Sequence, residues 1–314
     1  MIRHRELPRL RTAAVGVFGI AFLAGMAFVS PATAEDESQA QGAVLAVDAV
    51  NPDIFDGASR STYEAAEVGA SGEVTIESAS GEDILDVVLP DTSGDTSVVD
   101  GLAVLNQNNG SSIVPVPQAN GSVAIHAVLN DSSAPESFEY TLKLDEGDVL
   151  VSAGEGGGFG VFDAAGSPRV LGAEPWAKDA NGVEVATRYE IVGDMVIQHV
   201  DHHAANYAYP IVADPYMRNA LVQSHRWETS NRVLVTPTQY ARGWAGNVWW
   251  VNVGNAGFDE LVSKQIGSQR GRLNNSARNQ YICHVGYAPF KSTWNLETSK
   301  GDKGLGGFVR GLCN

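Results

Sequence analysis

The sequence predicts a mainly β protein, with an antiparallel β-sandwich-like stalk followed by a small α+β domain closed by a disulfide. Three observations lead to this prediction. Short alternating segments separated by polar turns follow one another from about residue 74 to residue 200, as in antiparallel sandwiches. Five of the six tryptophans lie beyond Pro215. Both cysteines, Cys283 and Cys313, also lie in this last part.

The first 34 residues have the pattern of a cleavable signal peptide. Four arginines precede an apolar run from about Thr12 to Val29, and Pro31 then interrupts any helix. The small residues 32–34 suit a signal peptidase. An uncleaved anchor is the alternative, because the apolar run is just long enough to span a bilayer. We therefore expect a secreted chain that works outside the cell or in the cell envelope.

The rest of the chain divides into three parts by composition. Residues 35–70 are rich in Ala, Glu, Asp, Ser and Gly. We expect them to form a flexible acidic leader, since they offer little apolar surface to bury. Residues 71–217 are expected to form the β-sandwich-like domain, and residues 218–314 the basic, tryptophan-rich α+β domain.

Alternation of apolar and polar side chains predicts the strands of the sandwich. The clearest case is residues 137–144, where Phe138, Tyr140, Leu142 and Leu144 share one face. The other predicted strands are residues 74–77, 84–89, 122–129, 149–152, 160–162, 187–192 and 195–200.

In the C-terminal part, residues 232–237 and 247–253 are predicted to be strands because they are rich in Val and Trp. Residues 255–266 are predicted to form an amphipathic helix. Its apolar stripe consists of Phe258, Leu261, Val262 and Ile266.

The cysteine count favours a disulfide between Cys283 and Cys313, because an exported protein with an even number of cysteines usually pairs them. Closing a loop of about thirty residues would stabilise the domain by on the order of 3–4 kcal/mol. The alternative makes the Cys283 thiol a nucleophile with His284 as its base. Adjacent residues on a strand point to opposite faces, so this pair would meet poorly.

Charge is divided unevenly along the chain. Residues 35–217 contain 5 Lys and Arg against 31 Asp and Glu, whereas residues 218–314 contain 12 against 5. The division suggests different partners for the two parts. We expect the basic part to bind an anionic polymer, such as nucleic acid, teichoic acid or an acidic glycan. Alternatively, it docks on its own acidic neighbour.

Five residues are the candidates for such binding. Arg242, Arg270, Arg272 and Arg278 have the guanidinium groups that hold phosphate or carboxylate. Trp244 lies between Gly and Ala in a predicted loop. It is the tryptophan expected to be exposed for stacking, although most tryptophans in a small domain belong to its core.

An enzyme is the main alternative function, either a small secreted hydrolase or a nuclease-like toxin. A metal-independent nuclease needs a base, an acid and a cation, and His225, His284 and Arg242 supply these groups. No spacing among them is diagnostic, so a surface His225 and a satisfied His284 remain the plainer interpretation. A structural envelope protein is a third alternative.

The densest titratable cluster is residues 199–203, where His199, Asp201 and His203 project from one side of a predicted strand. Spacing indicates no fourth ligand of the kind that a zinc site requires. We therefore expect neither a metal nor another cofactor, and keep these three residues only as weak candidates.

Two stretches carry family resemblances. Residues 175–182, the hairpin through Val200 and residues 209–215 resemble a module of exported actinobacterial proteins, which implies a carrier or stalk. The segments 281–284, 294–297 and 313–314, with Trp227, residues 235–237 and Arg242, resemble the actinobacterial family called domain of unknown function 2599. That resemblance covers residues 220–314 and implies an exported domain stapled by its two cysteines, without an assigned activity.

Overall fold

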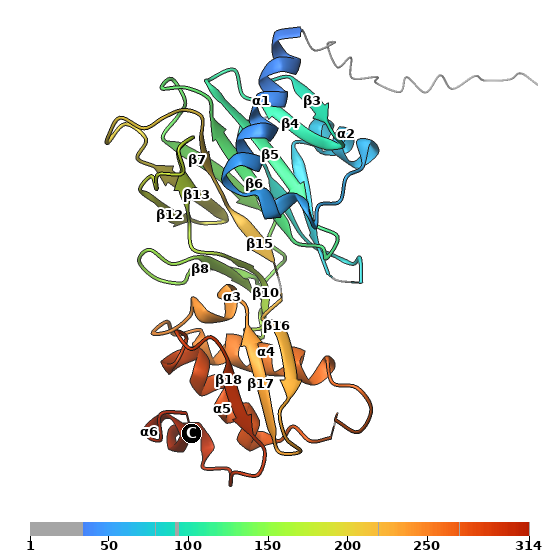
Figure 1. Cartoon of the computed structure of the whole chain (residues 1–314), viewed down its shortest axis with the longest axis vertical. Helices are drawn as coiled ribbons and strands as arrows, with labels where there is room; N and C mark the ends of the chain where they lie inside the picture. The colour runs from blue at the N-terminus through green and yellow to red at the C-terminus, as the bar shows by residue number, and fades with distance from the viewer. Residues whose placement is uncertain (1–33, 79, 92–93, 219, 270, 314) are drawn as a thin grey trace, which may run out of the picture. The chain divides into compact units, whose positions relative to one another are not determined.

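A computed structural model describes residues 34–313 except 79, 92, 93, 219 and 270 (Figure 1). The predicted signal peptide therefore lies outside the described residues, apart from Ala34. No helix in the described part of the chain is long and apolar enough to cross a membrane.

Two antiparallel sheets form the predicted sandwich. The smaller sheet has the strand order β1-β2-β7-β13-β12. Its strands are β1 (Glu73–Glu77), β2 (Asp83–Val88), β7 (Ser137–Leu142), β13 (Met195–Val200) and β12 (Thr187–Val192). The larger sheet has the order β3-β4-β5-β6-β15-β10-β9-β8, with β14 beside β6 and β11 beside β14. Its strands are β3 (Thr96–Val99), β4 (Leu102–Asn106), β5 (Ser111–Pro117), β6 (Val123–Leu129), β15 (Tyr216–Arg218), β10 (Pro168–Gly172), β9 (Phe159–Phe162), β8 (Val149–Ser152), β14 (Ile211–Ala213) and β11 (Ala177–Lys178).

One apolar core lies between the two sheets. Phe138, Tyr140 and Leu142 of β7 face it and are at most 2 % exposed, whereas the residues between them are more exposed. Ile113 and Ile125 of the larger sheet belong to the same buried cluster. The predicted mainly β fold and the alternation of β7 are therefore confirmed.

The segment for which the sequence predicted a flexible leader is helical in the structure. It forms α1 (Ala34–Val50), the short 3-10 helix η1 (Pro52–Phe55) and α2 (Thr62–Ser71). Ala40, Ala43, Val44 and Val47 of α1 lie on one face at helical spacing and pack on the outer face of β4, β5 and β6. Alanine and valine side chains thus form the contact between α1 and the sheet. The sequence prediction missed it because it considered only large apolar residues.

The C-terminal part combines a three-stranded sheet with helices. The sheet order is β16 (Val222–Trp227), β17 (Arg232–Pro237) and β18 (Trp294–Glu297). The helices are α3 (Gln239–Arg242), α4 (Trp250–Ser263), η2 (Gly267–Gln269), α5 (Asn275–Tyr287) and α6 (Gly304–Arg310).

The strand predicted at residues 247–253 is wrong, because α4 begins at Trp250. Two glycines of this helix let α5 approach closely. A Cβ atom on Gly254 would lie 2.9 Å from the Cα atom of Ile282, and one on Gly257 would lie 2.3 Å from the Tyr281 hydroxyl. Packing against α5 therefore overrides the strand preference of the Val and Trp residues.

The predicted disulfide between Cys283 and Cys313 is confirmed, with the two Cα atoms 5.4 Å apart. Both cysteines are buried beside Phe308 of α6. Cys283 and His284 lie on α5, not on a strand as the sequence analysis assumed. The sulfur atom of Cys283 is bonded, so the thiol nucleophile is not present in this structure.

The sandwich and the C-terminal part share a second core. Phe162 of β9 packs edge to face on Trp244, with ring centroids 5.2 Å apart, and stacks on Trp249 at 4.4 Å. The side-chain amide of Asn247 donates to the carbonyl oxygen of Ser152 at 3.0 Å. These contacts hold α3 over the end of the larger sheet and form one wall of the cleft described next.

Candidate functional site

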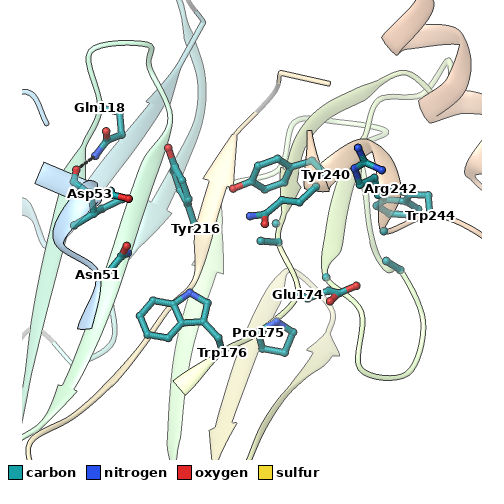
Figure 2. Close-up of a pocket in the computed structure, with 17 residues that line it drawn as sticks. Asn51, Asp53, Gln118, Glu174, Pro175, Trp176, Tyr216, Tyr240, Arg242 and Trp244 are labelled. Carbon is teal, nitrogen blue, oxygen red and sulfur yellow. Dashed lines mark hydrogen bonds between the residues drawn. The ribbon is translucent and has the colours of Figure 1, made fainter. Parts of the chain in front are cut away.

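A cleft of about 660 Å³ lies where η1, the segment between β10 and β11, β15 and α3 meet. We call it the aromatic cleft (Figure 2). Its larger side chains are four aromatic residues and six polar ones, namely Trp176, Tyr216, Tyr240, Trp244, Asn51, Asp53, Gln118, Glu174, Gln239 and Arg242. Clefts of this size with a few converging polar groups are the usual form of small-molecule sites.

Trp176 is half-buried, lines the cleft and directly precedes β11. Its main chain is fixed by Asp214: the Trp176 amide donates to Oδ1 of Asp214 at 2.9 Å, and the Asp214 amide donates to the Trp176 carbonyl at 3.3 Å. Gln198 Nε2 also donates to the same Oδ1 at 3.2 Å. The ring itself meets His126 edge to face, with centroids 6.1 Å apart. The indole is therefore held in place before any ligand arrives.

Asp214 is 1 % exposed. Burial raises the pKa of its carboxyl group to about 7, while hydrogen bonds from the Trp176 amide, Tyr189 and Gln198 oppose the shift. The fully buried hydroxyl of Tyr140 has no hydrogen-bond partner among the described residues. The buried groups beneath the main chain of Trp176 are therefore polar, and one of them, Asp214, is easily protonated.

Tyr240 forms the opposite wall of the cleft. Thr238 caps the start of α3 by accepting a hydrogen bond from Ala241, which places Tyr240 at the first turn. The Tyr240 ring meets Tyr216 edge to face, with centroids 6.1 Å apart. Burial raises the pKa of Tyr240, and the neighbouring Gln239 side chain opposes this shift. Within the described residues, its hydroxyl has no partner at hydrogen-bond distance.

A buried hydroxyl without a partner costs free energy unless a ligand or water completes its hydrogen bond. Tyr240 lines the cleft (Figure 2), but its hydroxyl oxygen has almost no accessible surface. The hydroxyl of Tyr216 is within 3.0 Å of Ser122 Oγ. Tyr240 therefore presents its ring to the cleft, and its hydroxyl can meet a ligand only if the wall shifts on binding.

Arg242 lines the aromatic cleft, but most of its donors bind the protein itself. Its guanidinium donates to the main-chain carbonyls of Pro289, Lys291 and Ser292 and lies over the ring of Trp294. These contacts shape the loop after α5. Nη1 donates to two of these carbonyls and Nη2 to one, so three of the five N–H donors are occupied and an anion could use at most the other two.

Of the other predicted binding residues, only Trp244 also lines the cleft among those that the structure describes. Trp244 is 1 % exposed, so the expectation of an exposed Trp244 is wrong. Arg278 forms an ion pair with Asp259 at 2.5 Å. Arg272 lies over the ring of Trp227, 5.4 Å from its centroid. Arg270 lies outside the described residues.

The two candidate catalytic histidines do not line the aromatic cleft. His284 is 1 % exposed, stacks on Trp294 and shares a 2.7 Å hydrogen bond with the carbonyl of Gln280. Burial lowers the pKa of His284 to about 4, so the ring is neutral. His225 lies half-buried on β16, where burial and the charge of Lys264 lower its pKa. His284 has the contacts of a core histidine.

The three weak metal candidates have other neighbours. His199 shares a 2.8 Å contact with Glu190, and Asp201 lies 3.9 Å from Arg188. The ring of His203 lies against His202, with centroids 3.9 Å apart. Across the described part of the chain, no three His, Cys, Asp or Glu side chains form a group that could hold a metal ion.

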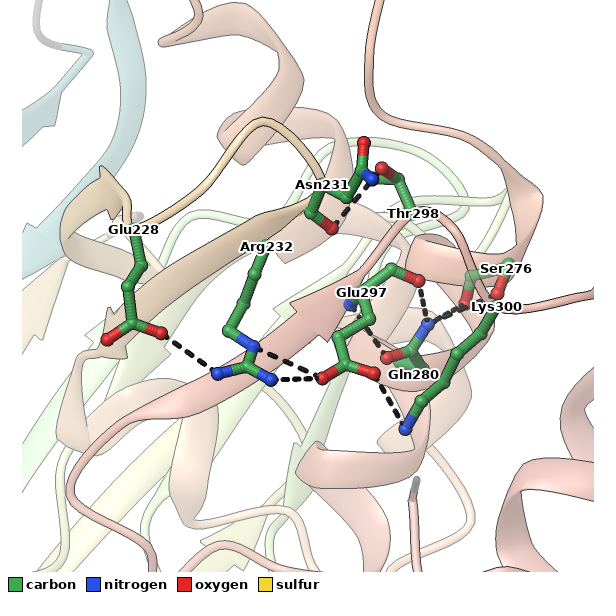
Figure 3. A network of polar contacts seen from close by, with 8 residues as sticks. All are labelled: Glu228, Asn231, Arg232, Ser276, Gln280, Glu297, Thr298 and Lys300. Carbon is green, nitrogen blue, oxygen red and sulfur yellow. Dashed lines mark hydrogen bonds and ion pairs between the residues drawn. The ribbon is translucent and has the colours of Figure 1, made fainter.

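A polar network on the small C-terminal sheet is structural (Figure 3). Arg232 binds Glu297 at 2.7 Å and Glu228 at 3.1 Å, and Lys300 binds Glu297 at 2.9 Å. The hydrogen bonds with Lys300 and then Arg232 lower the pKa of Glu297. The Gln280 side chain donates to the carbonyl of Glu297 and accepts from its amide, each at 2.9 Å. It thereby replaces a neighbouring strand at the edge of β18.

Sequence reasoning identified Arg242 and Trp244 but missed the other residues of the aromatic cleft. Trp176 is the tryptophan that lies outside the tryptophan-rich part, and it follows Glu174 and a proline. A tryptophan in such a polar, proline-containing segment was the available signal. The remaining lining residues come from distant parts of the chain, so no local spacing could have revealed their meeting.

Residues 222–314 match a family described as "Protein of unknown function (DUF2599)". This match confirms the resemblance of the C-terminal part and extends over β16 to the C-terminus. No curated protein and no solved structure is significantly similar to the chain.

Proposed function

We propose that this chain is a secreted binding protein that holds an extracellular ligand in the aromatic cleft. The observation that carries the proposal is the half-buried indole of Trp176, on a main chain fixed by Asp214, opposite the ring of Tyr240 in the cleft. A flat apolar ring with polar groups around it can stack on one face of a ligand and orient its polar substituents.

Secretion is supported by two features. The first 34 residues have a positively charged start, an apolar run and small residues at the cleavage position. The Cys283–Cys313 disulfide is of the kind that persists in oxidising compartments outside the cytoplasm. Together they favour a ligand that is found outside the cell or in its envelope.

Binding is favoured over hydrolysis by the placement of the residues that the sequence predicted to be catalytic. Nucleophilic or acid–base catalysis needs two groups within reach of one substrate atom. His284 is enclosed in the C-terminal core, and the sulfur of Cys283 is bonded. The secreted hydrolase or nuclease-like toxin that uses His225 and His284 is therefore the weaker proposal.

Recognition of a polyanion by the arginines is also less well supported. Arg242 binds main-chain carbonyls, Arg278 binds Asp259, and Arg232 binds two carboxylates. Each of these contacts neutralises the charge of an arginine or uses N–H donors that would otherwise bind phosphate. The cleft thus offers a better-formed site than the basic surface.

The test replaces Trp176 by alanine and compares its effect on ligand binding with that of the same replacement at another half-buried tryptophan. Trp250 is also half-buried, but it lies on α4 over Gly286 and does not line the cleft. We expect Trp176→Ala to weaken ligand retention at least tenfold and Trp250→Ala to change it less than twofold. The probes are purified peptidoglycan, chitin, cellulose, teichoic acid and DNA, measured by sedimentation or calorimetry, with circular dichroism as the folding control. The proposal would be overturned if Trp176→Ala bound every polymer that the wild type binds, and bound it equally well.

A further inference from the structure

A second hollow adjoins the aromatic cleft. It has a volume of about 360 Å³ and is lined by Arg218, Gln223 and residues 237–238, together with four residues that it shares with the cleft. The shared residues are Tyr216, Gln239, Tyr240 and Arg242. The two hollows are therefore the two sides of one wall, and the exposed side chain of Gln239 lies on that wall.

We infer that the two hollows form one continuous site for an extended, uncharged oligosaccharide, with one sugar ring stacked on Trp176 and the chain crossing Gln239 and Tyr240. This inference rests on the proposed function and names its ligand class. The room in the cleft alone suits a drug-sized ligand, roughly two or three sugar rings. A ligand confined to one ring would leave the second hollow empty.

The hydrogen-bonding groups of the cleft favour hydroxyl-bearing ligands. Asp53 and Glu174 are exposed lining residues, and no ion pair joins either to a described residue. An ionised carboxylate only accepts hydrogen bonds. Sugar hydroxyls donate to such groups, whereas phosphodiester and sulfate groups have no hydrogen to give and are repelled by the charge.

The charges around the site point in the same direction. Residues 35–217, which supply Asp53 and Glu174, contain 31 acidic and only 5 basic residues. Three basic residues lie at the site: Lys178, 5.9 Å from the ring centroid of Trp176, and Arg218 and Arg242, which line the hollows. They offset Asp53 and Glu174 locally, so it is the acidic excess of the surrounding part that repels an anionic polymer on approach.

The second hollow adds a guanidinium to the site. Arg218 lines this hollow and lies 5.6 Å from the ring centroid of Tyr240. Its Nε is buried, so the terminal nitrogens of the half-buried side chain are the groups that could donate to a ligand oxygen, such as the acyl oxygen of a neutral sugar. Because Gln239 and Arg242 line both hollows, a ligand meets N–H donors along the site and carboxylate acceptors at the Trp176 end.

The experiment titrates the full mature chain by calorimetry with β-linked N-acetylglucosamine oligomers and cello-oligomers of two to six units. Affinity should rise at least tenfold between two and five units and then level off. Gln239→Trp, which obstructs the exposed crossing between the hollows, should abolish most of this gain. Absence of any length dependence in the wild-type protein would overturn the inference of a continuous site.

The proposed ligand class and the proposed binding function of the cleft can fail separately. If neutral oligomers do not bind but teichoic acid binds in a manner that Trp176→Ala abolishes, the ligand class is wrong and the cleft remains the site. If oligomers bind with equal affinity to wild type and Trp176→Ala, the cleft itself is wrong.

Discussion

Asp214 and Trp176 hold each other through two hydrogen bonds that join a carboxyl group and two stretches of main chain. Oδ1 of Asp214 accepts from the Trp176 amide at 2.9 Å, and the Asp214 amide donates to the Trp176 carbonyl at 3.3 Å. One partner is a buried acid and the other carries the indole of the aromatic cleft. The position of the proposed platform therefore depends on a residue that does not line the cleft.

Replacing Asp214 should separate its hydrogen bonds from its charge. In Asp214→Ala, the amides of Trp176 and Gln198 lose a buried acceptor, so we expect a loss of about 1–3 kcal/mol in the free energy of unfolding. Asp214→Asn retains an acceptor oxygen and should lose less. Urea unfolding measures both, and equal losses for Ala and Asn would show that the acceptor oxygen is unimportant.

The same carboxyl group predicts a pH dependence of stability. Burial raises the pKa of Asp214 from about 3.8 to about 7, so the folded state binds a proton that the unfolded state releases between these values. The contribution of Asp214 to stability should therefore fall as pH rises from about 4 to about 7. Its slope approaches about 1.4 kcal/mol per pH unit in mid-window.

The measurement is the difference in unfolding free energy between wild type and Asp214→Asn at several pH values. Groups that titrate equally in both proteins cancel in this difference. We expect the wild type to lose stability relative to Asp214→Asn as pH rises. A difference that stays constant from pH 4 to pH 8 would mean that Asp214 titrates alike in the folded and unfolded states.

The sandwich was predictable because its signal is local. Alternation identified β7 and β13, since each strand has one face in the core between the sheets. The helix α1 was missed because its contact depends on Ala40 and Ala43, whose side chains are small. The strand expected at residues 247–253 had the right residue types, but Gly254 packs against α5 and a helix results.

The cleft could not be predicted from the sequence for a different reason. Asp53, Trp176 and Tyr240 are separated by more than fifty residues from one another, and the fold alone brings them together. The candidates chosen by residue type had structural roles: Arg242 binds a loop, and His284 fills a core. Residue type indicates which chemistry is available, and burial decides where it can be used.

The two histidines should differ in their effect on stability. His284→Ala removes a fully enclosed ring that stacks on Trp294, so we expect a loss of about 2–4 kcal/mol. His225→Ala, at a half-buried strand position, should cost less than about 1 kcal/mol. Thermal unfolding measures both, and ligand retention should persist in His225→Ala. Loss of a hydrolytic activity in His225→Ala, with its fold intact, would instead revive the enzyme interpretation.

Reduction of the Cys283–Cys313 bond should lower the free energy of unfolding by on the order of 3–4 kcal/mol, since it releases a long loop in the unfolded chain. The Cys283→Ser and Cys313→Ser double variant should show the same loss without reductant. Titration of native protein with a thiol reagent should find no free thiol. Two reactive thiols in the secreted protein would contradict the pairing.

The most direct test of the central claim is fluorine NMR of protein labelled with 5-fluorotryptophan. The six tryptophans give separate probes, which Trp→Phe variants assign. On titration with an N-acetylglucosamine pentamer, we expect the Trp176 signal to shift most, whereas buried Trp294 remains nearly unchanged. A titration in which a bound ligand shifts Trp227 or Trp250 and leaves Trp176 unmoved would contradict a ligand site in the aromatic cleft.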